Sequence, residues 1–186
     1  MERRIKLAKT LFTIGHSTRP LAEFLALLAA HGIRQVVDVR TIPRSRRNPQ
    51  FEREALRAAL QKARIAYRHL PGLGGLRHPK RDSVNQGWRN ASFRGFADYM
   101  STPEFARRLS RLRQLAQRRL TAIMCAEAVP WRCHRSLIAD ALTAQQWQVR
   151  HIQSRRTARP HKPTEFLRIR RGKLGYPAAE RPSSAR

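Results

Sequence analysis

The sequence has few acidic residues and few cysteines, and both shortages limit what the protein can be. Only 12 Asp and Glu stand against 39 Lys and Arg, which excludes an acidic, disordered solvating protein. Two cysteines cannot build a disulfide framework, and no basic-then-apolar leader precedes Gly15. No apolar run approaches the roughly 20 residues of a membrane span, since the most apolar stretch, 21–30, is short and contains Glu23. We therefore expect a soluble, cytoplasmic protein.

The excess of positive charge, formally +27 at pH 7, has two interpretations. A field of this sign attracts polyanions and releases their counterions on contact, which favours a phosphate-bearing ligand or a nucleic acid as partner. However, 33 of the 39 basic residues are Arg and only six are Lys. Codon bias alone could produce this composition without any ligand, so both interpretations stay open.

Short apolar runs alternate with segments of helical periodicity along most of the chain. The runs predict five strands, at 11–14, 36–39, 65–70, 121–125 and 149–152. Helices are predicted at 21–31, 49–63, 93–100, 103–116 and 133–146. Apolar strands joined by helices form parallel sheets that are covered on both faces. We therefore predict a three-layer α/β fold, with a mainly parallel sheet of about five strands flanked by helices.

The composition changes after Ser154, because residues 155–186 hold ten Lys and Arg together with several prolines. We predict a single α/β domain over 1–154 and a basic, flexible C-terminal tail over 155–186. Phe166, Leu167 and Ile169 leave open the alternative of a short docked edge strand.

Polar and reactive residues follow the predicted strands at one end of the sheet. In open parallel sheets ligands bind beyond the carboxyl ends of the strands, where loops and helix N-termini converge. We expect ligand-binding contacts there from Ser17, Arg40, Gly74, Gly75, Cys125, His134 and Arg135.

Cys133 is the first of three candidate catalytic residues. It lies at the predicted N-terminus of a helix between Arg132 and Arg135, and both the helix dipole and the cations stabilise a thiolate. The alternative is a small buried apolar side chain, an interpretation that is stronger for Cys125 at the end of its strand.

His16 and Glu127 are the other two candidates. His16 follows the first strand, where a general base or an anion donor would stand, and its alternative is a satisfied structural donor. Glu127 is the candidate carboxylate partner of Arg135. If the two residues pair, Arg135 is structural, and if Glu127 faces solvent or substrate, Arg135 is an anion clamp. Arg40 offers a fork to phosphate, and the alternation of Asp38 to the opposite face makes their pairing awkward.

The long polar loop 77–92 is typical of a binding loop or lid. Trp88, Arg89 and Asn90 combine an aromatic ring, a guanidinium and an amide, a composition that stacks bases and neutralises phosphates. The alternative is that Trp88 anchors a folded-down lid.

No metal ligand set is predicted, because Cys125 and Cys133 are eight positions apart and His134 is expected to diverge from Cys133 by a helical step. A metal site completed by His16 stays an alternative. A cysteine-phosphatase site is disfavoured, since six residues and no glycine cradle separate Cys125 from Arg132.

Several motifs, in order from about residue 11 to 152, resemble the domain-of-unknown-function family numbered 488. They are Thr13-Ile14-Gly15-His16-Ser17, Asp38-Val39-Arg40, Pro43-Arg44-Ser45, Leu73-Gly74-Gly75, Gly87-Trp88-Arg89-Asn90, Phe93-Arg94-Gly95, Met124-Cys125-Ala126-Glu127 and Cys133-His134-Arg135. The resemblance implies a small bacterial or archaeal cytosolic α/β domain and implies no activity or cofactor.

These observations predict a pocket, lined by Cys, His and Arg, for a phosphate-bearing ligand such as a nucleotide or nucleic acid. Whether the protein is an enzyme or a binding module stays open. The alternatives are a metal-binding or redox-responsive thiol protein and a non-enzymatic nucleic-acid-binding module.

Overall fold

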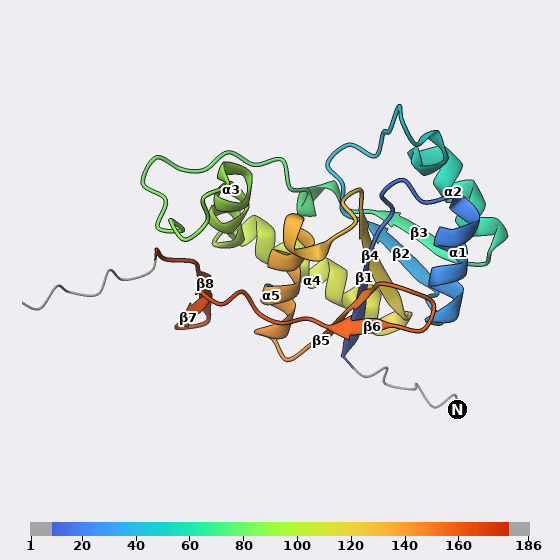
Figure 1. The fold of residues 1–186 in the computed structure, drawn as a ribbon. Helices are drawn as coiled ribbons and strands as arrows, with labels where there is room; N and C mark the ends of the chain where they lie inside the picture. The colour runs from blue at the N-terminus through green and yellow to red at the C-terminus, as the bar shows by residue number, and fades with distance from the viewer. Residues whose placement is uncertain (1–8, 179–186) are drawn as a thin grey trace, which may run out of the picture.

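The main sheet has six strands in a computed structural model that describes residues 9–178 (Figure 1). The strands are β1 (Thr10–Gly15), β2 (Gln35–Asp38), β3 (Ala66–His69), β4 (Thr121–Cys125), β5 (Gln148–Ile152) and β6 (Ala158–Pro160). Their order is β3-β2-β4-β1-β5-β6, and only β6 runs antiparallel to its neighbour. The five predicted strands are all present, and the predicted mainly parallel sheet is confirmed.

Helices cover both faces of this sheet (Figure 1). They are α1 (Leu21–Ala30), α2 (Arg53–Lys62), α3 (Ala91–Met100), α4 (Pro103–Arg118) and α5 (Arg135–Thr143). Side chains of α1 and α2 form one core, and those of α3, α4 and α5 form a second core on the other face. The three-layer α/β prediction is therefore confirmed. Within residues 9–178, no helix combines the length and the apolar character that crossing a bilayer requires.

The central strands are apolar on both sides, which is why they lie between two helical layers. In β1, Leu11 packs into the core of α4 and α5, whereas Phe12 and Ile14 pack into the core of α1 and α2. Successive side chains of a strand point to opposite faces, so Thr13 shares the face of Leu11. Thr13 thereby lies under α5, where it contacts Arg135.

The start of α5 differs from the prediction in a way that matters for the site. Pro130 opens a short 3-10 turn, η3 (Pro130–Arg132), and Cys133 then has an extended backbone. The helix begins at Arg135 and not at Cys133. Cys133 and His134 therefore lie in the loop before the helix, where adjacent side chains are not separated by a helical step.

The segment predicted as a flexible tail packs on the domain instead. Strand β6 pairs with β5, and the side chain of Tyr176 is 1% exposed beside Trp88 and Phe166. Ile169 lies in the separate hairpin of β7 (Arg168–Arg170) and β8 (Lys173–Gly175), and is not on the edge of the main sheet. The high Arg content of this segment favoured the prediction of a flexible tail, because the few apolar side chains that anchor it form no pattern in the sequence. Residues 1–8 and 179–186 of the predicted domain and tail lie outside the described part.

Candidate functional site

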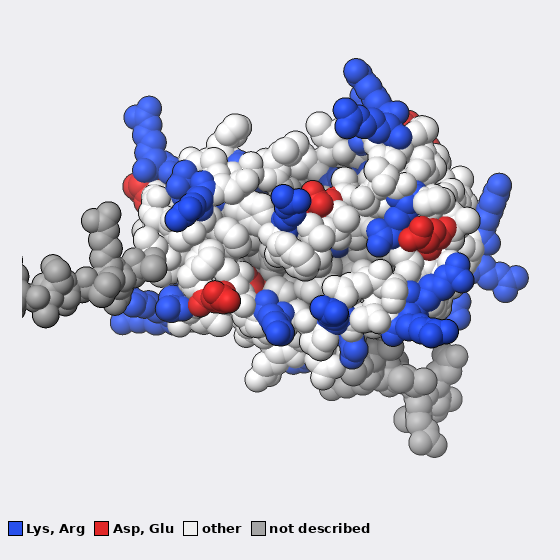
Figure 2. All heavy atoms as spheres, viewed as in Figure 1, with Lys and Arg blue, Asp and Glu red and all other residues white. Residues whose placement is uncertain are grey.

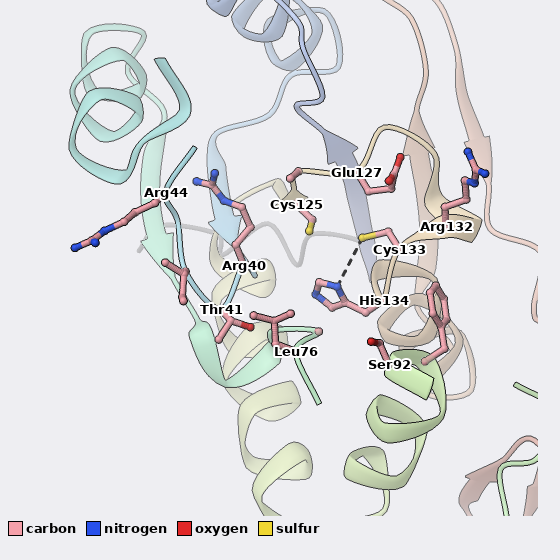
Figure 3. A pocket seen from close by; sticks show the side chains of 14 residues that line it. Arg40, Thr41, Arg44, Leu76, Ser92, Cys125, Glu127, Arg132, Cys133 and His134 are labelled. Carbon is pink, nitrogen blue, oxygen red and sulfur yellow. Dashed lines mark hydrogen bonds between the residues drawn. The ribbon is translucent and has the colours of Figure 1, made fainter. Parts of the chain in front are cut away.

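A cavity of about 390 Å³ opens at the carboxyl ends of β2 and β4 (Figure 3). Loops after these two strands, the loop before α5 and the start of α3 all contribute to its wall. Such convergence is expected where parallel strands end at one edge. Its lining residues are Arg40, Thr41, Ile42, Arg44, Gly75, Leu76, Ser92, Phe93, Cys125, Ala126, Glu127, Arg132, Cys133 and His134.

The two cysteines and His134 form a cluster in the wall of this cavity. Their sulfur and nitrogen atoms all lie within 4.8 Å of one another, and His134 Nδ1 is 3.7 Å from Cys133 Sγ (Figure 3). The prediction that His134 diverges from Cys133 is wrong, because α5 begins after both residues. Cys133 is 4% exposed, so the cavity is its route to a ligand.

Arg135, the first residue of α5, lies beneath the cluster and is 1% exposed. Its Nε donates to Cys133 Sγ at 3.4 Å and its Nη1 donates to Thr13 Oγ1 at 3.3 Å. Its Nη2 donates to the backbone carbonyl of Glu127. The exposed Glu127 carboxylate makes no ion pair with Arg135. Of the two alternatives left open for Arg135, the pairing with the Glu127 carboxylate is not formed, and the anion clamp gains no support because each nitrogen of Arg135 donates to a group of the protein itself.

The hydrogen bonds around Cys133 favour its ionised form. A hydrogen bond from the Cys125 thiol, with further contributions from His134 and Arg135, holds the pKa of Cys133 well below its usual value, although burial opposes this. The same hydrogen bond to Cys133, followed by burial, raises the pKa of Cys125. These interactions favour the ionised form of Cys133 and the protonated form of Cys125.

Arg40 also lies at this edge, but a carboxylate holds it. Its Nε and Nη2 donate to Asp38 at 2.9 and 2.6 Å, and Nη2 donates to the Phe51 carbonyl at 2.9 Å. The argument that alternation makes this pairing awkward is wrong, because side chains two positions apart in an extended segment point to the same face, so Asp38 and Arg40 lie on one side. The geometry gives no support to an anion shared between Arg40 and Arg135, since Asp38 occupies the Arg40 fork.

His16 is a satisfied structural donor in this arrangement. Its Nδ1 donates to the Ser17 carbonyl at 2.8 Å, its Nε2 lies 3.3 Å from Arg40 Nη1, and its ring stacks on Phe51. Burial, the largest cause, lowers its pKa to about 4, which leaves the ring neutral near pH 7. His16 is not among the residues that line the cavity, so the structure does not bring this candidate base to the thiolate.

The remaining predicted ligand contacts divide between packing and surface positions. Added Cβ atoms at Gly74 and Gly75 would lie 2.2 Å from Thr41 Oγ1 and 2.5 Å from His134 Nδ1, so both glycines permit close packing. Ser17, with φ of 49°, forms the turn after β1 and donates its amide to Ala126. Neither Ser17 nor Gly74 lines the cavity.

The loop 77–92 stays largely outside the cavity. Trp88 packs against Phe93, Phe166 and Tyr176, which favours the alternative of a lid anchor. Arg89 is exposed, and Asn90 caps α3 by accepting from the amides of Ser92 and Phe93. Only the start of α3, with Ser92 and Phe93, reaches the site.

A family model describes most of this edge of the sheet. The domain of unknown function DUF488 matches residues 20–142, which include both cysteines, His134 and Arg135. The chain belongs to the DUF488 family. No curated protein matches the chain, and no solved structure matches it. Membership in DUF488 therefore comes without an assigned activity, and the chemistry has to be argued from the residues.

The cluster of this DUF488 chain also has the donor atoms that a soft metal ion takes. Cys125, Cys133 and His134 are the one group of this kind found in residues 9–178, and thiolate with imidazole suits Zn²⁺ or Cu⁺. The Cys125 proton would have to leave first. His16, which the alternative of a metal site named as the completing ligand, does not belong to the group.

Sequence reasoning missed several residues that complete the cavity and its support. Three of them, Thr41, Leu76 and Ser92, line the cavity. Thr41 directly follows Arg40, Leu76 directly follows Gly75, and Ser92 lies in the first turn of α3. Thr13, Asp140 and His151 do not line the cavity, and all three are buried polar residues. The signal for Asp140 was a charged residue among the apolar positions of a helix.

Basic side chains are widespread on the surface rather than confined to the cavity. On the face that Figure 2 shows, Lys and Arg of the described residues are distributed around the periphery with few acidic side chains between them. This view singles out no one basic patch.

Proposed function

We propose that the cavity binds a small phosphate-bearing ligand and that Cys133 acts on this ligand as a thiolate nucleophile. The observation that carries the proposal is the environment of Arg135. A buried guanidinium is costly unless an opposite charge compensates it, and the side chain it touches that can ionise is Cys133. Ionised Cys133 supplies that charge directly, whereas the nearest alternative acceptors are neutral carbonyl and hydroxyl oxygens.

A thiolate in this position has the properties of a nucleophile. The thiolate, and not the thiol, attacks electrophiles, and Cys133 faces the cavity. Its sulfur would supply the electron pair for the new bond to the ligand, while the leaving group departs with the pair of the broken bond. Cys125 lies beside it as a second sulfur.

The rim of the cavity supports an anionic and partly apolar ligand. Arg44 and Arg132 are exposed lining residues that lie on opposite sides of the opening in Figure 3. Ile42 and Leu76, which are 60% and 71% exposed, add apolar surface between them. Because the buried thiolate repels anions, a phosphate would lie at the rim and the electrophilic part of the ligand would reach inward to Cys133.

The thiolate is tested by alkylation of the full chain with iodoacetamide between pH 5 and 9, with peptide mass spectrometry to separate the two cysteines. Cys133 should react with a midpoint below the usual ~8.5 for a thiol, and Cys125 should stay unmodified over this range. A Cys133 midpoint at or above that of a free thiol would contradict the proposal.

The ligand is tested by thermal unfolding with inorganic phosphate, a nucleoside monophosphate and the uncharged nucleoside. A ligand that binds only the folded state raises the melting temperature, so the two anions should stabilise and the nucleoside should not. Arg44→Gln with Arg132→Gln should abolish the rise, whereas Arg111→Gln, an exposed arginine on α4, should leave it. Equal effects of these variants would show attraction by overall charge alone.

A further inference from the structure

A continuous series of hydrogen bonds connects the Cys133 thiolate to the C-terminal segment. Arg135 donates to both Cys133 Sγ and Thr13 Oγ1. Thr13 Oγ1 lies 2.8 Å from His151 Nδ1, and His151 Nε2 lies 3.0 Å from His161 Nδ1. His161 Nε2 lies 2.8 Å from Asp140 Oδ1. The series begins at Arg135 on α5, passes through Thr13 on β1, His151 on β5 and His161 directly after β6, and ends at Asp140 on the same helix.

The fold sets each step of this series. Thr13 of β1 and His151 of β5 are register partners in the parallel ladder. His161 directly follows β6 and donates its amide to the Val149 carbonyl of β5, which places its ring next to His151. Arg135 and Asp140 lie on α5, which covers these strands.

The hydrogen bonds have a consistent direction when both rings are neutral. A guanidinium only donates, so Thr13 Oγ1 accepts from Arg135 and can donate its own proton to His151 Nδ1. His151 Nε2 then donates to His161 Nδ1, and His161 Nε2 donates to Asp140. Burial, together with the nearby His161 and Arg135, lowers the pKa of His151 to about 4, so this ring is neutral near pH 7. Every donor points from the cation toward the carboxylate.

We propose that His151 and His161 are positioning residues for the Cys133 thiolate. Their hydrogen bonds orient the Thr13 hydroxyl so that its oxygen faces Arg135, and this oxygen fixes the guanidinium against the sulfur. Arg135 cannot release a proton, so the series orients charge and does not conduct protons. The inference rests on the proposed function, because it concerns what holds the nucleophile in its reactive form.

Contacts other than the two histidines also attach the C-terminal segment. The buried Asp140 carboxylate also accepts from the amide and the hydroxyl of Thr164, at 3.0 and 2.7 Å, and from the Tyr176 hydroxyl at 3.0 Å. These donors hold the segment without contacting Thr13 or Arg135. They therefore offer variants that weaken docking and leave the series intact.

The experiment compares His161→Ala, His161→Gln and Thr164→Val in the full chain, with the pH profile of Cys133 alkylation and the melting temperature as readouts. His161→Ala should move the alkylation midpoint upward by about half a pH unit. This shift should slow the reaction at pH 6 about threefold, because a full pKa unit corresponds to a factor of ten. His161→Gln should restore the profile, since its amide accepts from His151 and donates to Asp140. Thr164→Val should lower the melting temperature and leave the midpoint in place.

His151→Asn supplies a second interruption if His161→Ala does not fold, because the shorter side chain reaches Thr13 and not His161. An unchanged midpoint in both variants would overturn the positioning role, as would an equal shift in Thr164→Val. Either result leaves the proposed function standing where the wild-type midpoint is low. A wild-type midpoint like that of a free thiol would instead remove the proposed function itself.

Discussion

Two buried arginines at the same edge of the sheet differ in what balances their charge, and this difference decides their roles. Arg40 pairs with the Asp38 carboxylate at 2.6 Å, so its charge is used within the fold. Arg135 contacts a sulfur, a hydroxyl and a carbonyl. A cation of this second kind stabilises negative charge on its partner, and the proposal that Cys133 is reactive rests on this contact.

The role assigned to Arg40 predicts a large effect of Asp38→Asn on stability. The change leaves the Arg40 guanidinium, which is 5% exposed, without a carboxylate, and breaking a buried ion pair from one side costs about 3 kcal/mol or more. Glu23→Gln is the matched control, because Glu23 is half exposed and pairs with Arg19 on the surface. That pair should contribute no more than about 0.5 kcal/mol. Urea unfolding measures both, and similar losses would contradict the structural role of Asp38.

At the scale of elements, the sequence predicted the strands well because buried parallel strands are continuous apolar runs. It also placed Cys125, Cys133 and His134 at one edge, since parallel strands end together. The Asp38–Arg40 pair follows from the same strand geometry, because side chains two positions apart point to the same face, and the expectation of opposite faces applied this alternation incorrectly. The prediction from the sequence also misplaced the start of α5, since Pro130 begins a 3-10 turn that resembles a helix start.

The docking of residues 158–178 could not be predicted for a different reason. Its anchors are single residues such as Tyr176, and their partners, Asp140 and Asn85, are distant in sequence. The composition of this segment is dominated by arginine and does not indicate which residues are anchors. Long-range contacts of isolated side chains leave no periodic pattern.

The helix cap at Asn90 gives an element-scale prediction. Asn90 accepts from two amides at the start of α3, as Thr102 does from one amide at the start of α4. Asn90→Ala and Thr102→Ala should each cost about 1 kcal/mol of unfolding free energy. If Asn90 only caps, Asn90→Ala leaves stabilisation by phosphate unchanged. A selective loss of that stabilisation in Asn90→Ala would return Asn90 to the ligand-binding residues.

Removal of residues 155–186 gives a second prediction at this scale. The truncation takes away the His161, Thr164 and Tyr176 donors of the fully buried Asp140, and an unsatisfied buried charge costs about 3 kcal/mol or more. We expect a clearly lower melting temperature. Ile169→Ser, at a half-exposed position of β7, should change stability by less than about 0.5 kcal/mol. An unchanged melting temperature after truncation would show that the segment contributes nothing to the fold.

For the whole molecule, a net charge of +27 makes acidification unfavourable in itself, since protonation adds to the repulsion. Two buried histidines add a specific contribution with its own pH window. His16 and His151 both have their pKa lowered to about 4, with burial as the largest cause. The contribution of Asp98 to stability is lost only at lower pH. Burial raises the pKa of its carboxyl, but hydrogen bonds from Ser83, Lys80 and Asn85 outweigh burial and lower the pKa.

The last prediction is that the free energy of unfolding decreases as the pH falls from about 6.5 to about 4. In this window the unfolded chain, with histidines near their usual ~6.5, binds protons that folded His16 and His151 do not bind. Stability therefore rises with pH here and levels off above 6.5. Each histidine contributes at most about 3 kcal/mol over the full window, from 1.36 kcal/mol per pKa unit. His16→Asn should remove about half of the slope in urea unfolding at pH 4.5, 5.5 and 6.5, whereas His31→Asn, at a less buried histidine on the end of α1, should leave it unchanged. Parallel curves for His16→Asn and the wild type would mean that His16 is protonated in the folded protein, and its stacking on Phe51 beside Arg40 would then need another explanation.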